Sequence, residues 1–242
     1  MKRRILLTGS AGGVGTMFRD WAGDRYDFVC FDRNPTPGAP DAVVGDLTDL
    51  PALERAAAGC DTLVHLGAYP NPADFLSVIV PNNIVGAYHA YEAAARAKLR
   101  RVVFASSLQV EEGYPRGTFV SVDMPARPVN PYAVSKAFGE NLGQVYSRRH
   151  GLSVICLRFG HVVVPSKEAF LLARAAIPSV VSLTARDGCE IISRAIDVEG
   201  VDYAVVDAFS RNAAQIRDLK PLRDILGYEP QDDAYALWGV RK

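Results

Sequence analysis

The chain has 242 residues, of which 49% are hydrophobic and 22% are charged, a composition that excludes disordered and fibrous proteins. Its 27 Lys and Arg residues balance 27 Asp and Glu residues, so no net charge would attract nucleic acid or an anionic membrane. No apolar run approaches the ~18 residues of a membrane span, and the apolar part of the basic start is too short for a signal peptide. We therefore expect a cytoplasmic protein with a small-molecule partner, no nucleic acid and no membrane.

The reactive side chains are widely scattered. The histidines lack metal-ligand spacing, so we expect no metal site; they are His65, His89, His150 and His161. No Cys-x-x-Cys occurs, and we expect reduced, mostly buried cysteines at positions 30, 60, 156 and 189.

Short apolar or β-branched runs recur along the chain and predict strands. In chain order they cover residues 4–9, 27–32, 41–46, 61–68, 101–107, 152–160 and 201–208. Helical stretches lie between most of them, such as 50–59, where Asp49 is a candidate cap, and the alanine-rich 82–99. Several strands are apolar throughout, as parallel strands covered on both faces must be. The alternation predicts an α/β fold, a doubly wound (Rossmann) parallel sheet with helices on both faces.

The pattern weakens from about residue 165. A mixed segment is followed by a helix around 187–196, one strand, and a short helix at 219–227. With no repeat and no linker, we expect a single domain over 1–242. Residues 1–164 would form mainly the nucleotide-binding core, and 165–242 a small substrate-binding lobe built onto the same sheet.

The glycines of "TGSAGGVG" follow the first predicted strand and precede a helix expected from Val14. Gly9, Gly12 and Gly15 would let the backbone approach a phosphate closely, while the amides and dipole of the helix N-terminus attract its charge. An ordinary strand-to-helix turn is the alternative. The glycines from Gly9 to Gly15 do not by themselves decide between a phosphate site and an ordinary turn.

Asp32 favours the phosphate interpretation, because it ends the next strand at about the 20-residue spacing of an acid that binds an adenosine ribose. Its carboxylate would repel a 2′-phosphate, so we predict NAD; the adjacent Arg33 leaves NADP open. Asp46 is a candidate for the adenine amino group, and the end of the fourth strand lets the cofactor approach the backbone. The predicted cofactor-binding residues are Gly9, Ala11, Gly12, Gly13, Val14, Gly15, Asp32, Arg33, Asp46, Leu47, Leu66, Gly67, Ala68, Tyr132 and Lys136.

Tyr132 and Lys136 lie four positions apart in a stretch that begins as a helix, with Asn130 as cap. One helix face would then carry both, and a nearby ammonium and a positively charged nicotinamide would favour the phenolate. This spacing also occurs on many exposed helices. Ser106 and Ser107 end a strand at the same sheet edge, and we favour Ser107 for orienting a substrate oxygen.

These motifs together resemble the extended short-chain dehydrogenases/reductases of the NAD-dependent epimerase/dehydratase type. The resemblance covers the glycine turn, Asp32, "HLGA" at 65–68, "SS" at 106–107, "YAVSK" at 132–136 and "RFG" at 158–160. It implies that Tyr132 is the acid/base and that Ser107 positions the reacting oxygen. It also implies that Lys136 lowers the tyrosine pKa and binds the nicotinamide ribose, and that Asn83 holds a water in the proton relay.

Within that group the chain is most similar to the uronate dehydrogenases, which oxidise a hexuronic acid to a lactone with NAD. It departs from them at Leu108-Gln109, where they carry Asn-His, and at Pro70 and His161, where they carry serines. In place of their carboxylate-binding arginine this sequence offers Lys167, with Arg174 and Arg116 as other candidates or as surface charges. The predicted substrate-binding residues are Tyr69, Ser107, Leu108, Gln109 and His161.

We therefore expect an NAD-dependent oxidoreductase acting on a small sugar or sugar acid. The alternatives are a nucleotide-sugar epimerase or dehydratase with tightly bound NAD, and a non-catalytic NAD-sensing regulator. The resemblance further implies a homo-oligomer formed through the helices around 83–99 and 132–150.

Overall fold

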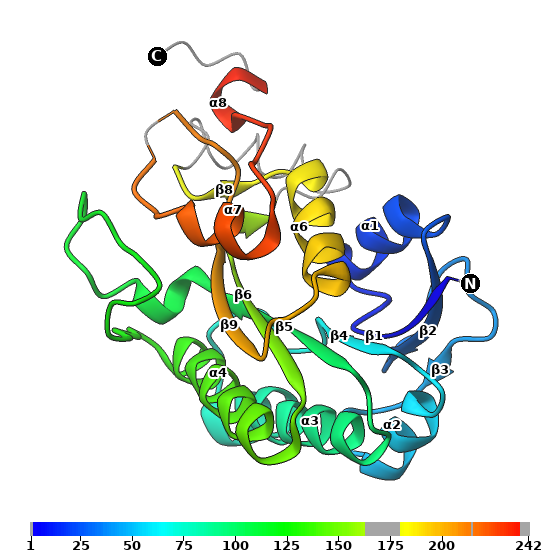
Figure 1. The fold of residues 1–242 in the computed structure, drawn as a ribbon. Coiled ribbons are helices and arrows are strands. Elements are labelled where there is room, and N and C mark those ends of the chain that lie inside the picture. The colour runs from blue at the N-terminus through cyan, green and yellow to red at the C-terminus, as the bar shows by residue number, and fades with distance from the viewer. Residues whose placement is uncertain (1, 163–179, 214, 238–242) are drawn as a thin grey trace.

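A seven-stranded parallel sheet forms the centre of the computed structural model, which describes residues 2–162, 180–213 and 215–237 (Figure 1). The strand order is β3-β2-β1-β4-β5-β6-β9. The strands are β1 Arg3–Thr8, β2 Tyr26–Asp32, β3 Val43–Val44, β4 Thr62–His65, β5 Arg101–Ser107, β6 Ser153–Phe159 and β9 Tyr203–Ala208. Each matches a predicted run, although the runs at 41–46 and 61–68 contribute only their central residues.

Helices cover both faces of this sheet. The α-helices of the described residues are α1 Gly13–Ala22, α2 Leu50–Ala57, α3 Gly86–Arg96, α4 Pro131–His150, α6 Ala185–Asp197, α7 Lys220–Leu226 and α8 Ala234–Leu237. A π-helical segment η1 spans Phe75–Val85, a 3₁₀ segment η2 spans Leu108–Glu111, and β7 His161–Val162 pairs in parallel with β8 Ser182–Leu183.

Two apolar layers hold the helices to the sheet. Phe18 of α1 and Ile192 of α6 pack with Ile5 of β1 in one layer, and Leu53 of α2 packs in the other with Tyr91 of α3. Figure 1 shows α2, α3 and α4 along one face and α1 and α6 along the other. This confirms the predicted α/β, doubly wound Rossmann sheet.

Two helices begin where the sequence predicts caps. Asp49 Oδ1 accepts the amide of Ala52 at 3.0 Å before α2, and Asn130 Oδ1 accepts the amide of Ala133 at 2.9 Å before α4. The Asn130 cap matters for function, because it fixes the turn of α4 that carries Tyr132.

The predicted helix over 82–99 is the largest difference. Regular α-helix begins only at Gly86, and the wider turns of η1 precede it. Pro81 explains this, since it has no N–H and its ring disrupts ordinary helical turns. Instead its carbonyl accepts the amide of Gly86, five residues on, which is the π-helical pattern.

The cysteines are unpaired, as predicted; Cys60 is half-buried, and Cys30, Cys156 and Cys189 are buried. Among the described helices, none combines the length and apolar character that crossing a membrane requires.

Candidate active site

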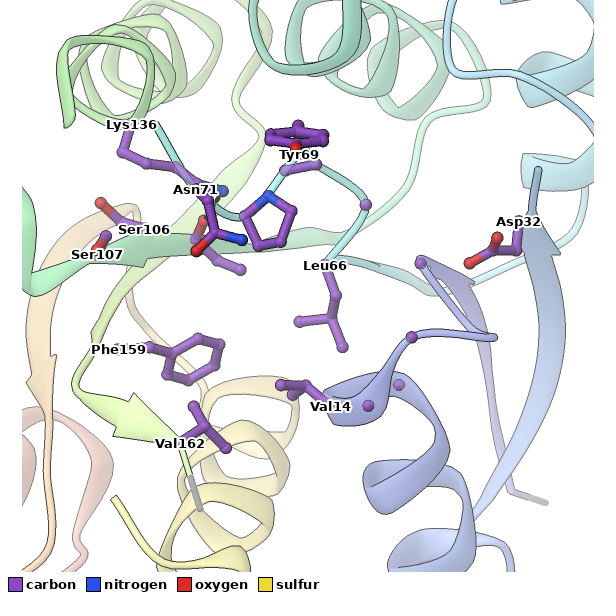
Figure 2. A pocket seen from close by; sticks show the side chains of 18 of the residues that line it. Val14, Asp32, Leu66, Tyr69, Asn71, Ser106, Ser107, Lys136, Phe159 and Val162 are labelled. Carbon is purple, nitrogen blue, oxygen red and sulfur yellow. Dashed lines mark hydrogen bonds between the residues drawn. The ribbon is translucent and has the colours of Figure 1, made fainter. Parts of the chain in front are cut away.

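A cavity of about 800 Å³ opens along the carboxyl edge of the sheet (Figure 2). Its lining comes from the carboxyl ends of β2, β5 and β6, from the segments that follow β1, β2, β3, β4, β5 and β6, and from the first turns of α1 and α4. The predicted site residues in this lining are Gly9, Ala11, Gly12, Gly13, Val14, Gly15, Asp32, Arg33, Leu47, Leu66, Gly67, Ala68, Tyr69, Ser107, Leu108, Gln109, Tyr132, Lys136 and His161.

The glycine turn forms one wall and requires bare backbone. Gly9 has a φ of +72°, and a Cβ there would lie 2.7 Å from the amide nitrogen of Gly67. A Cβ on Gly15 would lie 2.2 Å from the carbonyl oxygen of Gly9. The turn leads into α1, whose N-terminus has no side-chain cap. The arrangement therefore fits an anionic group that completes the helix start.

Asp32 lies at one end of the cavity, far from the serines (Figure 2). Its carboxylate accepts the amide of Ala11 at 3.1 Å and that of Asn34 at 2.9 Å, which joins the end of β2 to the glycine turn. The Arg33 guanidinium donates to the Asn82 side chain. Asp32 thus lies beside the glycine turn, as the spacing between Gly9 and Asp32 in the sequence predicted.

Asp46 does not line the cavity among the described residues. Its carboxylate accepts the amide and hydroxyl of Thr48, and these bonds hold the pKa of Asp46 below its usual value. The adjacent Leu47 does reach the lining. The predicted contact of Asp46 with an adenine amino group stays a prediction.

The turn after β4 is tied to its neighbours by short polar bonds. Gly67 donates its amide to Thr8 Oγ1 at 3.3 Å, and Thr8 Oγ1 is 2.7 Å from His65 Nδ1. Asn83 accepts the amide of Tyr69 at 2.8 Å and donates Nδ2 to the Tyr69 carbonyl and to Ser135 Oγ. Asn83 thus links this turn to α4 from behind the lining, and its predicted role with a water stays a prediction.

Tyr132 and Lys136 lie on one face of α4, as predicted, and both are buried. Lys136 Nζ donates to the Ala105 carbonyl at 2.7 Å and lies 5.7 Å from the centre of the Tyr132 ring. Burial lowers the pKa of Lys136 to about 8. Burial also raises the pKa of Tyr132, whereas its hydrogen bond with Ser107 acts in the opposite direction. An ammonium and a phenol therefore share one end of the cavity.

The two serines that end β5 differ in their partners. Ser106 Oγ donates to Glu140 Oε1 at 2.5 Å, whereas Ser107 Oγ accepts the amide of Gln109 at 3.2 Å and lies near the Tyr132 phenol, whose pKa it lowers. The structure therefore favours Ser107 over Ser106 as the partner of the phenol. Gln109 Oε1 in turn accepts Asn130 Nδ2 at 2.8 Å, which connects this turn to the cap of α4.

Several lining residues were not predicted as site residues. They are Phe31, Asn34, Gly45, Pro70, Asn71, Ala105, Ser106, Phe159, Gly160 and Val162. Figure 2 shows Phe159 and Val162 facing the cavity across from Tyr69 and Asn71. Phe159 ends β6 and Gly160 follows it, so the rule that ligands bind at the carboxyl edge would have found them if applied to the sixth strand.

Of the three charged candidates for binding a substrate acid, the structure describes Arg116 alone. Arg116 is exposed and outside the lining, and Lys167 and Arg174 lie outside the described residues. Among the residues that the structure does describe, no cluster of three or more His, Cys, Asp or Glu is arranged to bind a metal.

Comparison with known proteins identifies the family of this chain. The model of the NAD dependent epimerase/dehydratase family matches residues 5–201. This chain belongs to that family. An L-arabinose 1-dehydrogenase (NAD(P)(+)) of Haloferax volcanii is 32% identical over 250 residues, which cover 96% of this chain and 97% of the relative. A uronate dehydrogenase of Agrobacterium fabrum is 35% identical over 239 residues, covering 97% of this chain and 86% of the relative.

A solved structure has the same architecture. A mutant uronate dehydrogenase from Agrobacterium tumefaciens, complexed with NAD, superposes with a TM-score of 0.87 at 30% identity. The match covers 99% of this chain and 88% of that one. The resemblance to uronate dehydrogenases that the sequence indicates is thereby confirmed over nearly the whole chain.

Proposed function

We propose that this family member is an NAD-dependent dehydrogenase that oxidises a hydroxyl-bearing carbon of a small sugar or sugar acid, as in the conversion of an aldose or uronate to its lactone. One observation carries the proposal: Ser107, Tyr132 and Lys136 converge at one end of a cavity whose other parts are the glycine turn and Asp32. The L-arabinose and uronate dehydrogenases among its relatives support the substrate class.

The cavity fits NAD. The glycine turn from Gly9 to Gly15 would hold the pyrophosphate against the uncapped start of α1, and Asp32 would accept hydrogen bonds from the adenosine ribose. Lys136 would bind the nicotinamide ribose, and Leu66 to Ala68 would border the cofactor. When bound, NAD supplies the hydride acceptor for the carbon that is oxidised.

The protein supplies the proton chemistry. Tyr132 would remove the proton of the substrate hydroxyl, and Ser107 would donate a hydrogen bond to that oxygen as its charge develops. Burial alone disfavours the phenolate, so the Lys136 ammonium is needed nearby to favour it. Asn83, which ties α4 to the turn after β4, would hold the water through which the proton leaves.

The remaining lining residues would select the substrate. Tyr69, Leu108, Gln109 and His161 line the same cavity as Ser107 and Tyr132. For the domain organisation we keep a single domain, with 1–164 mainly the nucleotide-binding core and 165–242 mainly a small substrate-binding lobe built onto the same sheet. The unpaired cysteines support a cytoplasmic location.

We also propose that two copies associate through α3 and α4. Tyr88 of α3 is 42% exposed, and Val134 and Val145 of α4 are 47% and 44% exposed. Val134 and Val145 lie about three helical turns apart and therefore share one face. Large apolar side chains grouped this way are typical of an interface between subunits.

The experiment that tests the proposal measures NADH formation across a panel of free sugars. Neutral aldoses, aldose phosphates and uronic acids would each be offered with NAD. We expect at least one class to reduce NAD with a lactone as product. Conversion of nucleotide sugars by copurified NAD, without NADH release, would instead support an epimerase or dehydratase, and NAD binding without any turnover would support a regulator.

A further inference from the structure

Five charged side chains from five different segments meet behind the serine end of the cavity. They are Glu111 of η2, Glu140 of α4, Arg158 of β6, Asp207 of β9 and Arg217 of the segment after β9. Each is 5% exposed or less. We call these five residues the charge cluster. The proposed chemistry uses none of them, although burying so many charges is costly unless they are paired.

Glu111 connects the charge cluster to the substrate. It ends the segment Ser107–Glu111, the substrate turn, which presents Ser107, Leu108 and Gln109 to the cavity. Its Oε2 lies 2.7 Å from Arg217 Nη1 and its Oε1 lies 2.6 Å from Arg158 Nη1. Arg217 Nη2 also donates to the Leu108 carbonyl at 3.5 Å. Arg217 therefore contacts the substrate turn at two points.

Arg158 connects the same turn to the catalytic helix. It donates Nε and Nη2 to the two carboxylate oxygens of Glu140, both at 2.8 Å. Glu140 lies one helical turn beyond Lys136 on α4 and also accepts the Ser106 hydroxyl. The spacing between the substrate turn and the catalytic side chains of α4 thus depends on ion pairs within the charge cluster.

Arg217 is itself firmly placed by its backbone. Val120 donates its amide to the Ile216 carbonyl at 2.9 Å and accepts the amide of Asp218 at 3.0 Å, so the residues on both sides of Arg217 are bonded. Its guanidinium carbon lies 5.5 Å from the centre of the Phe209 ring. Because the backbone on both sides of Arg217 is hydrogen-bonded, its guanidinium can hold the groups that it contacts in fixed positions.

Asp207 is the acid of the charge cluster whose carboxylate makes no close ion pair. It is fully buried and lies opposite Arg158 in the sheet register, and neither carboxylate oxygen has a hydrogen bond among the described residues. Its nearest cation is Arg217 Nη1, 3.9 Å from Oδ2. The charged groups that face it are Arg217, Arg158, Glu111 and Glu140. Burial raises the pKa of Asp207 to about 7.

The ionisation of Asp207 would change the charge balance of the cluster. Two arginines balance two glutamates, so the charge cluster is neutral while Asp207 is protonated. A carboxylate at Asp207 would attract Arg217, whose Nη1 is now 2.7 Å from Glu111 and 3.9 Å from Asp207. Any movement of Arg217 toward Asp207 would lengthen its bond to Glu111 and release the substrate turn.

We propose that Arg217 is a positioning residue for the substrate turn, and that Asp207 competes with Glu111 for it, so that affinity for the sugar falls when Asp207 loses its proton. The inference rests on the proposed function for its substrate. It adds a pH-dependent support that lies outside the cavity and touches no reacting atom.

The first test compares the unmutated enzyme with Asp207→Asn, which keeps the shape of the side chain but cannot ionise. KM for the best sugar is measured at saturating NAD from about pH 6 to about pH 8.5. We expect KM to rise roughly three- to tenfold with pH in the unmutated enzyme and to vary less than about twofold in Asp207→Asn. Asp224→Asn, an exposed change in α7, should retain the rise. A KM that follows the same pH course with and without Asp207 overturns the proposal.

The second test removes the support. Arg217→Met should raise KM for the sugar about tenfold at pH 6, with kcat and the Kd for NAD within about threefold, and Arg217→Lys should restore part of the affinity. Arg223→Met, an exposed arginine of the nearby helix α7, is the matched control. Equal losses of sugar and NAD affinity in Arg217→Met would indicate general damage and contradict a positioning role.

A spectroscopic readout separates this inference from the proposed function. The infrared band of a protonated buried carboxyl should disappear with rising pH near neutrality in the unmutated protein and be absent in Asp207→Asn. If that band titrates but no sugar reduces NAD, the proposed function fails while the ionisation of Asp207 stands. If sugar is oxidised and no such band exists, the further inference fails.

Discussion

Lys136 places an ammonium in the interior, where burial lowers its pKa from 10.5 to about 8. Below pH 8 the folded protein must bury the charged form, which costs about 3 kcal/mol, and this cost declines between pH 8 and pH 10.5. Lys136→Met should therefore stabilise the cofactor-free protein by about 2 kcal/mol at pH 7, after loss of the bond to Ala105. The gain should vanish near pH 11.

Chemical denaturation at both pH values measures this effect, with the exposed Lys98→Met as control. A destabilised Lys136→Met protein at pH 7 would mean that the fold stabilises the ammonium, and would contradict the burial cost inferred for Lys136.

Tyr132→Phe removes the phenol and keeps the ring. Because the proposed role of Tyr132 is proton transfer, kcat should fall about 10²- to 10⁴-fold, while the Kd for NAD changes less than about threefold. Steady-state kinetics and calorimetric titration with NAD provide the two values. Turnover close to that of the unmutated enzyme would assign the proton transfer to another group.

The glycine turn is held in place by its neighbours, because Gly9 donates its amide to the Phe31 carbonyl of β2 and packs against Gly67 after β4. Gly9→Ala would place a Cβ 2.7 Å from the Gly67 amide nitrogen in a left-handed backbone, so we expect the Kd for NAD to rise at least about 100-fold. Gly38 has nearly the same φ, +70°, with nothing within 4 Å of a Cβ. Gly38→Ala should cost about 1 kcal/mol of stability and leave the Kd unchanged. A similar Kd for NAD in both variants would argue against a nucleotide at the turn.

Helices and strands could be predicted from the sequence where residues close together in the chain determine them. The seven strands followed from apolar runs, and α4 from its Asn130 cap, because backbone bonding and burial there depend on neighbouring residues in the sequence. The π-helical segment around Pro81 was missed, since ordinary helix patterns do not describe five-residue bonding. The contact of Arg217 with Glu111 joins residues about 100 positions apart, and no sequence spacing encodes it.

The candidate site was predictable to the same degree. The order of strands in a Rossmann sheet places the ends of β1, β4 and β5 together, so Gly9, Gly67 and Ser107, which the glycine spacing and the predicted strand ends had singled out, line one cavity. The sequence analysis favoured Ser107 over Ser106; the bond of Ser106 to the buried Glu140, which lies on a different element, could not be predicted from the sequence.

The whole molecule is expected to be a dimer. Val134→Glu combined with Val145→Glu would place two charges on the exposed apolar face of α4, so we expect monomers by sedimentation at concentrations where the unmutated protein is dimeric. Arg148→Glu combined with Arg149→Glu, exposed at the end of the same helix, is a control for added charge. An unmutated protein that sediments as a monomer would contradict this interface.

The central claim is that hydride passes from a sugar carbon to NAD at the end of the cavity where Tyr132 lies. An aldose or uronate carrying deuterium on its anomeric carbon tests this most directly. We expect NADH that has gained the deuterium and a lactone that has lost it, with both products formed at least about 100-fold more slowly in Tyr132→Phe. Deuterium retained in the sugar, or NADH formed without it, would contradict hydride transfer at this site.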